Sequence, residues 1–421
     1  MNRYVMFFLA CLMGHVASAQ TELRLSLSCP VSYEAAPVVV DLAPYGTVRS
    51  ALVTVDGRET PCQLDDLDND GQLDELSFVA DMKPGQQRVA NVKLMKTATP
   101  SEYKAQTYAE IVLRNQNVDK KNKHDIYLSA ISIDKQTTNP YNVLHHHGVA
   151  FENEMIAMRI YMDKRQTIDL YGKFHKGLEL RETQFYTSKE QKAQGYGDDI
   201  LLVGNSFGLG ALRGWNGVEP TMLDDVQHRT QRIVTQGPVR TIVEVEDAGW
   251  VIKAGTEPVN MTIRYTLYTG HRDMDVDVRF NRDISNERFS TGVVNVKNSS
   301  EINDGKGLRG CWGTDWPAAD TANWKLETVG MGVYVPAKYL EHVLPATKEN
   351  YGMVVKPIGK YIHYSLAYTS DNENFGYHSA KEWEGYMKEW KNRLENPVMV
   401  KKLSGGKAAT PKQSKSTRSR R

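Results

Sequence analysis

The chain of 421 residues is poor in cysteine and has no apolar run long enough for a membrane-spanning helix. Its four cysteines form no C-x-x-C motif, which disfavours the usual zinc and dithiol redox sites. A disulfide between Cys29 and Cys62 is compatible with an oxidising compartment. Cys311 would then be left unpaired, so we expect the large core, and not disulfides, to hold the fold together.

Several catalytic signatures are also missing. The sequence contains no G-x-S-x-G, no H-E-x-x-H and no G-x-x-x-x-G-K. Nucleophilic acyl chemistry, a helix-borne zinc site and P-loop phosphate binding are therefore disfavoured. No alternation of strands and helices supports a parallel α/β sheet.

Neither positive nor negative charge is in large excess in the sequence, except at the C-terminal end. Basic residues (52) and acidic residues (51) nearly balance, but six of the basic residues lie in the stretch 404–421, which contains no acidic residue. Without this stretch and Arg3, 45 basic residues face 51 acidic ones. A mildly acidic body disfavours nucleic acid as a partner, because phosphate binding needs a basic surface. The tail 404–421 is predicted to be disordered.

Residues 1–19 have the pattern of a secretory signal peptide. Arg3 precedes the apolar run 5–13, and Ala17-Ser18-Ala19 forms a small-residue cleavage site before Gln20. We therefore expect an exported protein, periplasmic or extracellular, with no integral membrane segment. A lipoprotein anchored through Cys11 is the alternative, since residues 8–11 fit a lipobox loosely.

The remaining sequence reads mostly as strands. Residues 260–269 and 273–280 alternate apolar and polar side chains, and Gly270 stands between the two runs. Period two is typical of a sheet with one buried and one wet face, so the pair predicts a hairpin. We predict an all-β fold made of large antiparallel sheets, with a small N-terminal β unit over 20–100, a linker over 96–103 and a main unit over 104–400.

One helix is predicted near the end of the main unit. Ser379 and Glu382 form a capping box, and Pro397 follows the end of the pattern. Trp383, Met387, Trp390 and Leu394 recur at helical spacing, which indicates a face packed on the sheets.

An Asp-rich stretch lies in the N-terminal unit. Asp66, Asp68, Asp70 and Asp74, with Gly71, match positions of a calcium loop. Ser77 stands where an EF-hand has its bidentate Glu, and the flanks read as strands, so an EF-hand is disfavoured. A hairpin with a structural Ca²⁺ and a solvated Asp/Gly turn both remain open, and no other cofactor is indicated.

The densest polar chemistry lies in residues 141–173. If 145–147 is extended, His145 and His147 share one face and His146 points away. Further along, Arg159 pairs with Tyr161, Glu152 with Glu154, and Asp169, Tyr171 and Lys173 share a strand face. Ordering long charged side chains on an open sheet is costly unless they pair or contact a ligand. We predict a ligand site here; a solvated face with surface ion pairs is the alternative.

Other groups suited to ligand binding lie downstream. His228 and Arg229 form a cationic pair, His363 is a further titratable group, and Trp312 and Trp316 offer flat faces that suit sugar rings. The alternative for the two tryptophans is a place in the core.

Five motifs resemble a known family. They are D-x-D-x-D-G-x-x-D-E-L (66–76), HHHGVAFENE (145–154), TIDLYGK (167–173), GYGDDILLVGNSFGLG (195–210) and HSAKEWEGY (378–386). The chain resembles a secreted bacterial domain-of-unknown-function family from polysaccharide-utilisation clusters, one branch of which is an ulvan-oligosaccharide dehydratase. The resemblance implies a galactose-mutarotase-like β-supersandwich, carbohydrate-active function and an oligosaccharide substrate.

Dehydration of a uronic acid is an elimination that needs a carboxylate binder, a base and an acid. From residue type, we assign Arg159 or Arg229 to the carboxylate, His145 or His147 to the base and Tyr171 to the acid. Glu154, Asp169, Lys173, His228, His363, Trp312 and Trp316 are predicted to contact substrate. A polysaccharide lyase or sugar epimerase on the same fold, and a non-catalytic glycan-binding protein, are the alternatives.

Overall fold

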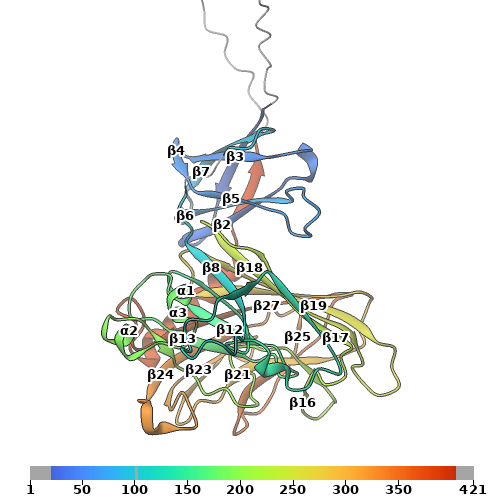
Figure 1. The fold of residues 1–421 in the computed structure, drawn as a ribbon. Helices are drawn as coiled ribbons and strands as arrows, with labels where there is room; N and C mark the ends of the chain where they lie inside the picture. Colours follow the sequence, from blue (N-terminus) through green and yellow to red (C-terminus); the bar gives the residue numbers. More distant parts are fainter. Residues whose placement is uncertain (1–19, 100–102, 404–421) are drawn as a thin grey trace, which may run out of the picture.

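The computed structural model describes residues 20–99 and 103–403. The predicted signal peptide, the tail 404–421 and part of the predicted linker lie outside these residues. Two β units are stacked, with the N-terminal unit above the larger main unit (Figure 1). No helix in the described part of the chain is long and apolar enough to cross a membrane.

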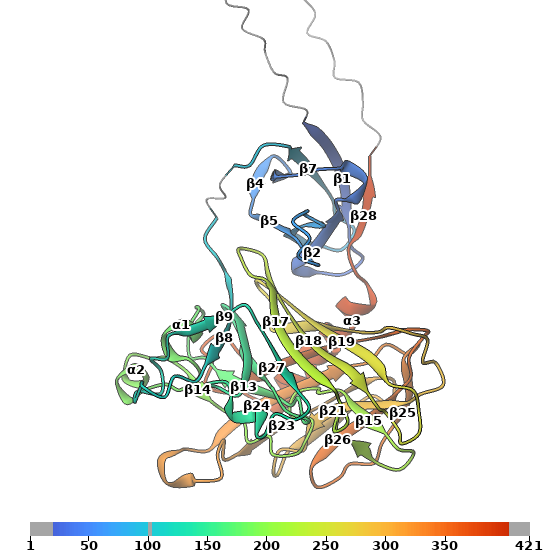
Figure 2. The ribbon, with the colours of Figure 1, turned by 45° about the vertical axis from the view of Figure 1, so that its right-hand side comes forward.

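The N-terminal unit packs two sheets around its own core, which includes Leu27, Val38, Leu76 and Phe78. The five-stranded sheet has the order β28 (Met399–Lys402), β1 (Thr21–Ser28), β7 (Gln87–Met95), β3 (Ser50–Val55), β4 (Arg58–Thr60). The three-stranded sheet has the order β2 (Tyr33–Asp41), β6 (Glu75–Met82), β5 (Cys62–Asp65). A short 3₁₀ turn, η1 (Ala43–Tyr45), follows β2. Strand β28 follows α3 in the sequence and pairs with β1, so the chain returns to this unit after leaving α3 (Figure 2).

The main unit packs a nine-stranded sheet against two smaller ones. The large sheet has the order β10 (Ala130–Asp134), β17 (His228–Thr235), β18 (Arg240–Trp250), β19 (Val259–Tyr268), β20 (Asp273–Phe280), β27 (Tyr361–Ser370), β24 (Glu327–Tyr334), β23 (Leu308–Asp315), β22 (Ser300–Asn303). The six-stranded sheet has the order β14 (Asp198–Asp199), β13 (Ile168–Gly172), β12 (Ala157–Tyr161), β11 (Gly148–Asn153), β8 (Thr107–Leu113), β9 (Ile126–Leu128). The second five-stranded sheet has the order β16 (Pro220–Thr221), β15 (Arg213–Trp215), β21 (Phe289–Val294), β26 (Asn350–Val355), β25 (Leu340–Val343).

The inward positions of these strands form one continuous apolar core, which includes Met158 and Ile160 of β12 and Ile263 and Tyr265 of β19. All paired strands run antiparallel in the described residues. The predicted hairpin forms as β19 and β20, and the predicted all-β sandwich with a small N-terminal unit and a C-terminal helix is confirmed.

Helices are few and short except at the end of the chain: α1 (Leu180–Thr183), α2 (Lys189–Ala193), η2 (Pro140–Asn142), η3 (Thr321–Asn323) and α3 (Ala380–Glu395). Helix α3 begins at the predicted cap, where Ser379 Oγ accepts a bond from the Glu382 amide. Trp383, Met387 and Trp390 are buried against the large sheet, and the Trp383 indole donates to the Met331 carbonyl of β24.

The Cys29–Cys62 disulfide that the sequence left open is not formed in the structure. Cys29, Cys62 and Cys311 are all buried free thiols. The Cys29 thiol lies 3.3 Å from the Asn396 carbonyl, whereas that of Cys62 lies 3.7 Å from the Ala51 carbonyl. The apolar core therefore holds this unit without a covalent link.

A buried histidine fastens the two units together. His271 Nε2 lies 3.0 Å from the Ala35 carbonyl of the N-terminal unit, and Nδ1 lies 3.2 Å from Asp273. Both partners are acceptors, so the ring fits best as the doubly protonated imidazolium. Burial lowers the pKa of His271, but Asp273 and the Ala35 carbonyl outweigh burial and leave that pKa raised.

This contact predicts pH-dependent stability. A raised folded-state pKa stabilises the fold fully below the unfolded value, and this stabilisation is lost as pH rises through the folded value. We expect His271→Gln to lower the free energy of unfolding by about 1.5–3 kcal/mol at pH 6, as for a charge-assisted hydrogen bond, and by less at pH 9. Urea unfolding across this range measures it, with His342→Gln on the exposed face of β25 as the control. A difference that does not change with pH would contradict the protonated contact.

Candidate functional site

The site is built on the outer face of the six-stranded sheet. Along β12, Met158 and Ile160 enter the core, so Arg159 points to the opposite face, and the buried Tyr161 ring still contributes to the core cluster. The register places Arg159 directly beside Asp169 of β13. Asp169 Oδ2 accepts bonds from Arg159 Nη2 at 2.6 Å and from the Tyr161 hydroxyl at 2.7 Å. The predicted Arg159–Tyr161 pair is therefore held by one carboxylate.

Segment 174–199 covers this sheet face and brings two aromatic residues to it. The Phe185 ring lies 4.1 Å from the Arg159 guanidinium carbon, and Tyr186 follows at the edge of the covered area. Gln184 and Phe185 have φ values of 47° and 66°, in the left-handed region that such residues rarely adopt. Backbone strain of this kind persists only where surrounding contacts hold it, and it aims the half-buried Tyr186 side chain at His147.

His147 and Tyr186 form a hydrogen-bonded pair. The Tyr186 hydroxyl lies 3.0 Å from His147 Nε2, and His147 Nδ1 lies 2.9 Å from the Tyr141 carbonyl. A carbonyl only accepts, so Nδ1 carries the proton and Nε2 presents a lone pair to the phenol. The Tyr141 ring stacks on the imidazole at 3.6 Å and fixes its plane. The pair is an imidazole acceptor linked to a phenol donor.

Burial and charge keep this imidazole neutral. Burial, with the nearby Arg159 as the next cause, lowers the pKa of His147 to about 3. Burial raises the pKa of Tyr186, so the phenol keeps its proton in the resting state. Arg159 Nη1 lies 3.4 Å from the Tyr186 oxygen, where it faces any negative charge that develops there.

Asp199 adds a carboxyl group to the site. Arg159 Nη2 donates to it at 3.0 Å, and its side chain keeps 14% exposure. Burial, followed by the like charge of Asp169, raises the pKa of Asp199 well above its ordinary value. One guanidinium thus faces two carboxylates, and Asp199 is the one suited to carry a proton.

A cavity of about 360 Å³ adjoins the cluster across the Tyr141 side chain. Asp163 and Arg165 also line it, and Arg165 lies over the Tyr141 and Tyr161 rings. On the other side, the exposed Lys121 lies 5.4 Å from the Tyr186 ring centre and has no ion-pair partner in the described chain. The site thus has basic side chains at its rim.

The three successive histidines do not alternate as predicted, because residues 145–147 form a turn and not a strand. His147 has φ 73°, in the left-handed region. His145 is buried against His124, and burial lowers its pKa to about 2. His146 is fully buried, with Nε2 3.2 Å from Glu110. Of the three, His147 is the one that hydrogen-bonds the Tyr186 hydroxyl, whereas the His145 ring meets the Tyr186 ring edge-on at 5.2 Å.

Tyr171 does not join His147, although the sequence places it on the Asp169 face. Its hydroxyl is buried among Glu179 at 2.9 Å, the Gly197 carbonyl at 2.8 Å and Thr187 at 3.1 Å. Burial, with Glu179 as the next cause, raises the pKa of Tyr171 well above its ordinary value. This phenol holds the covering segment in place, so the prediction that Tyr171 is the acid of the elimination is not kept.

Lys173 and Glu154 are also engaged in structural contacts. The fully buried Lys173 ammonium donates to Glu152, the Asn153 carbonyl and the Gly177 carbonyl, each at 2.6 Å. Glu154 accepts from the Gly270 amide at 2.6 Å, which fastens the turn between β19 and β20. Neither group points at the His147 cluster.

The remaining predicted residues are spread over the main unit. Arg229 is buried on Asp247 at 2.7 Å and lines the 360 Å³ cavity, whereas His228 is exposed and lies 3.5 Å from Asp134. Because neighbours on a strand point to opposite faces, the two do not form one cationic site. His363 lies 2.8 Å from Asp277 on the far face of the large sheet.

The two predicted tryptophans, Trp312 and Trp316, also lie in different surroundings. Trp312 is partly buried and packs against the apolar cluster beneath α3. Trp316 is half-buried and lines a cavity of about 220 Å³ with Asp315, Glu327 and Lys348. Trp316 therefore remains available to a ligand.

The Asp-rich stretch connects β5 and β6, so it is the loop of a β-hairpin as predicted. Carboxylate oxygens of Asp66, Asp68 and Asp74 lie within 4.8 Å of one another, and Asp70 is not part of this group. Asp66 also accepts from the amides of Asn69 at 2.7 Å and Gly71 at 2.8 Å. The loop thus combines a hydrogen-bonded turn with a donor set that fits a hard cation.

We expect added Ca²⁺ to raise the unfolding temperature. Three carboxylates without a basic partner in the described chain repel one another, and a divalent cation relieves this repulsion. At a hundredfold excess over Kd the gain is about 2.7 kcal/mol. Differential scanning calorimetry with Ca²⁺ or a chelator measures it. The Asp74→Asn variant should lose this rise in unfolding temperature, and the Asp56→Asn variant should keep it. If Ca²⁺ does not change the unfolding temperature of the unmodified protein, the loop is a hydrogen-bonded turn without a cation site.

Fold and site together describe an all-β protein with an acid–base cluster on one of its sheets. The chain belongs to the family described as "Domain of unknown function (DUF4861)", whose model matches residues 29–400. No curated protein matches the sequence. The prediction of a domain-of-unknown-function family is confirmed.

Two solved structures from Enterococcus faecalis are similar to the chain: a protein in the Glycosyl Hydrolase Family 38, and an alpha-mannosidase of strain V583. Each is 10% identical in sequence to this chain, and each match covers 91% of this chain. The TM-scores are 0.44 and 0.46. The match covers 47% and 46% of those chains, so this chain spans about half their length.

Sequence reasoning missed Tyr186 and Asp199. Asp199 lies in the glycine-punctuated motif 195–210, which supports the family resemblance but does not by itself indicate a site residue. Tyr186 lies 39 residues from His147 in a segment without a recognisable motif. No pattern in the sequence indicates that this segment folds over β12.

Proposed function

We propose that the protein is an enzyme that eliminates water from uronic-acid-containing oligosaccharides. The observation that supports this best is the half-buried pair of a neutral imidazole and a phenol, His147 and Tyr186, beside the Arg159 guanidinium. The family resemblance supports the substrate class. A site of this kind moves protons and offers no nucleophile for acyl transfer.

In the elimination, a base removes the proton on the carbon next to the carboxylate. The electron pair of that C–H bond forms the carbon–carbon double bond, and the hydroxyl on the next carbon leaves with a proton as water. We assign the first step to the Tyr186 oxygen, which passes its own proton to His147 Nε2 as it accepts the substrate proton. Arg159 stabilises the partial negative charge that the phenol oxygen carries while the two protons move.

The departing hydroxyl needs an acid, and we assign this role to Asp199. Its raised pKa lets it hold a proton, and its contact with Arg159 fixes its position. Arg159 is already shared by Asp169 and Asp199, so it is poorly placed to neutralise the substrate carboxylate. Lys121 at the rim is better suited, because it has no competing carboxylate in the described chain.

Mass spectrometry of a panel of uronic-acid oligosaccharides tests the proposal. We expect a product of unchanged chain length that has lost one water. Shortened products would indicate a polysaccharide lyase, and unchanged mass with altered stereochemistry by NMR would indicate an epimerase. Binding without any product would indicate a glycan-binding protein, for which the cavity beside Trp316 is the structural argument.

A further inference from the structure

A second groove lies on the opposite face of the large sheet from the His147 cluster. It has a volume of about 830 Å³ and is lined by outward-facing side chains of β17 to β20 and β27, with Leu67 and Asp68 of the Asp-rich loop above them. On β17, Gln231 faces the six-stranded sheet, where it bonds the Val149 amide, so its neighbour Arg232 faces the groove. We infer that this groove is a second oligosaccharide-binding site.

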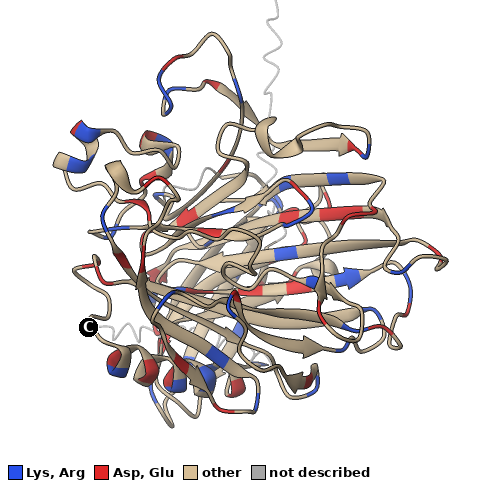
Figure 3. Cartoon of the chain, turned by 90° about the horizontal axis from the view of Figure 1, so that it is seen from below, with Lys and Arg blue, Asp and Glu red and all other residues tan. Residues whose placement is uncertain are grey.

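The floor of the groove is a row of alternating charges. Five residues are successive Cα partners across five strands: Arg232, Glu244, Arg264, Asp277, His363. Neighbouring strands carry basic and acidic segments in turn (Figure 3). Glu244 accepts from Arg232 at 2.6 Å and from Arg264 at 2.7 Å, and Asp277 contacts His363 at 2.8 Å. These pairs fix the side chains along the sheet and neutralise most of their charge.

The adjacent row is left open to a ligand. Glu246, Thr262, Arg279 and Tyr361 are again successive Cα partners. In the described residues neither Glu246 nor Arg279 has an ion-pair partner, and both are exposed. Tyr361 is 52% exposed. This row therefore offers an acceptor, a hydroxyl, a guanidinium and an aromatic face, one on each strand.

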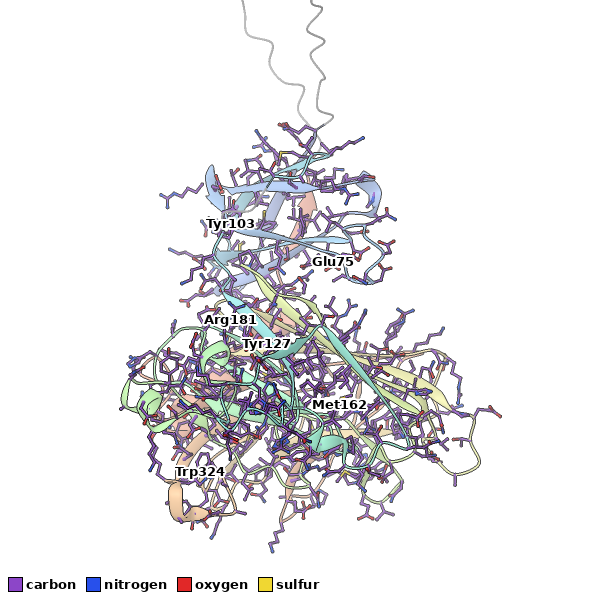
Figure 4. All side chains as sticks on the ribbon, in the orientation of Figure 1. Glu75, Tyr103, Tyr127, Met162, Arg181 and Trp324 are labelled. Carbon is purple, nitrogen blue, oxygen red and sulfur yellow. The ribbon has the colours of Figure 1, made fainter. Side chains whose placement is uncertain are left out.

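The roof of the groove is held firmly. Asp65 lies at the base of the Asp-rich hairpin and pairs with Arg240 of the large sheet at 2.6 Å in a buried contact, and Arg240 also pairs with Glu75 at 2.7 Å. Figure 4 labels Glu75 on the side of the N-terminal unit that faces the main unit. Arg232 Nη2 lies 3.4 Å from the Leu67 carbonyl. The groove is therefore a fixed feature between the two units.

These properties suit a sugar chain. Ring hydroxyls both donate and accept hydrogen bonds, which matches a lining of mixed polar groups at the spacing of strands, about 4.8 Å. A tyrosine face suits the apolar face of a sugar ring. The volume falls in the usual range for ligand sites. Nearly balanced charges disfavour nucleic acid, which needs a basic surface.

Isothermal titration calorimetry and hydrogen–deuterium exchange test this inference. Trigalacturonate serves as the acidic probe and mannotriose as the neutral one. We expect at least one of them to bind and to protect loop 66–74 from exchange. The double variant Arg279→Ala/Tyr361→Ala should bind at least tenfold more weakly and lose this protection. Thr262→Trp, which fills the groove, should do the same, and Arg58→Ala on β4 should not.

Unchanged affinity and protection in both groove variants would overturn the inference, as would the absence of binding by the unmodified protein. The inference does not depend on the chemistry at His147. Tyr186→Phe should keep the groove protection, so a failure of the proposed elimination and a failure of the groove are told apart. Protection confined to residues 141–199 would also count against the groove.

Discussion

Tyr186→Phe and His147→Ala are each expected to lower kcat/KM for a uronic-acid oligosaccharide by about 10²–10⁴-fold, the usual contribution of a positioned acid–base group. The phenylalanine variant keeps the ring and removes the oxygen that lies 3.0 Å from Nε2. The alanine variant leaves the phenol with no acceptor for its proton. Initial rates by the absorbance of the new double bond measure both effects.

Matched controls separate chemistry from folding. Tyr45→Phe removes a phenol oxygen from the N-terminal unit, and His342→Ala removes an exposed imidazole from β25; both should keep full activity. The loss should fall on kcat more than on KM, because the pair acts on the proton and not on substrate binding. Full turnover by either site variant with native stability would remove the pair from the mechanism.

Lys173→Met is expected to destabilise the fold by about 3–5 kcal/mol, as for the removal of one partner from a buried ion pair. Lys173 and Glu152 are both fully buried, and each ammonium hydrogen has an acceptor. The substitution leaves the Glu152 carboxylate facing only the amides of Glu179 and Leu180. Urea unfolding at neutral pH measures the change.

A double-mutant cycle gives the control for this prediction. Glu152→Gln added to Lys173→Met removes the stranded charge, so the double variant should be more stable than the sum of the two single effects. Burial raises the pKa of Glu152, so Lys173→Met should lose less stability in acid, where this carboxyl binds a proton. A single-variant loss below about 1 kcal/mol would show that the site relaxes around the charge.

These predictions differ in how far the sequence leads to them. The residue types of the site are visible in 141–173, because His147, Arg159 and Asp169 lie within a short polar stretch between apolar strand positions. Period two in β12 and β13 also predicts correctly that Arg159 and Asp169 leave the core. Face-sharing alone, however, groups Tyr171 with them, and only the path of the covering segment shows that its hydroxyl is taken by Glu179.

The histidine turn shows the same limit. An extended geometry for 145–147 predicts that alternate histidines act together, yet residues 145–147 form a turn in which His147 hydrogen-bonds the Tyr186 hydroxyl and His145 only packs against its ring. That conformation is held by the Tyr141 stacking and by a partner from another segment, and neither contact is local. The return of the chain from α3 to β28 is likewise a tertiary contact, and the short strand carries no distinctive pattern.

By itself, the amino-acid order determined the all-β architecture, the capped helix α3 and the hairpin around the Asp-rich loop, because strand period, helix caps and turn residues act over a few neighbours. The tertiary structure alone decided that Tyr186 and Asp199 join His147 and Arg159, and that Trp312 packs against the apolar cluster beneath α3. Such pairings depend on which distant segments bury one another's apolar surface, and this is a property of the whole packed chain.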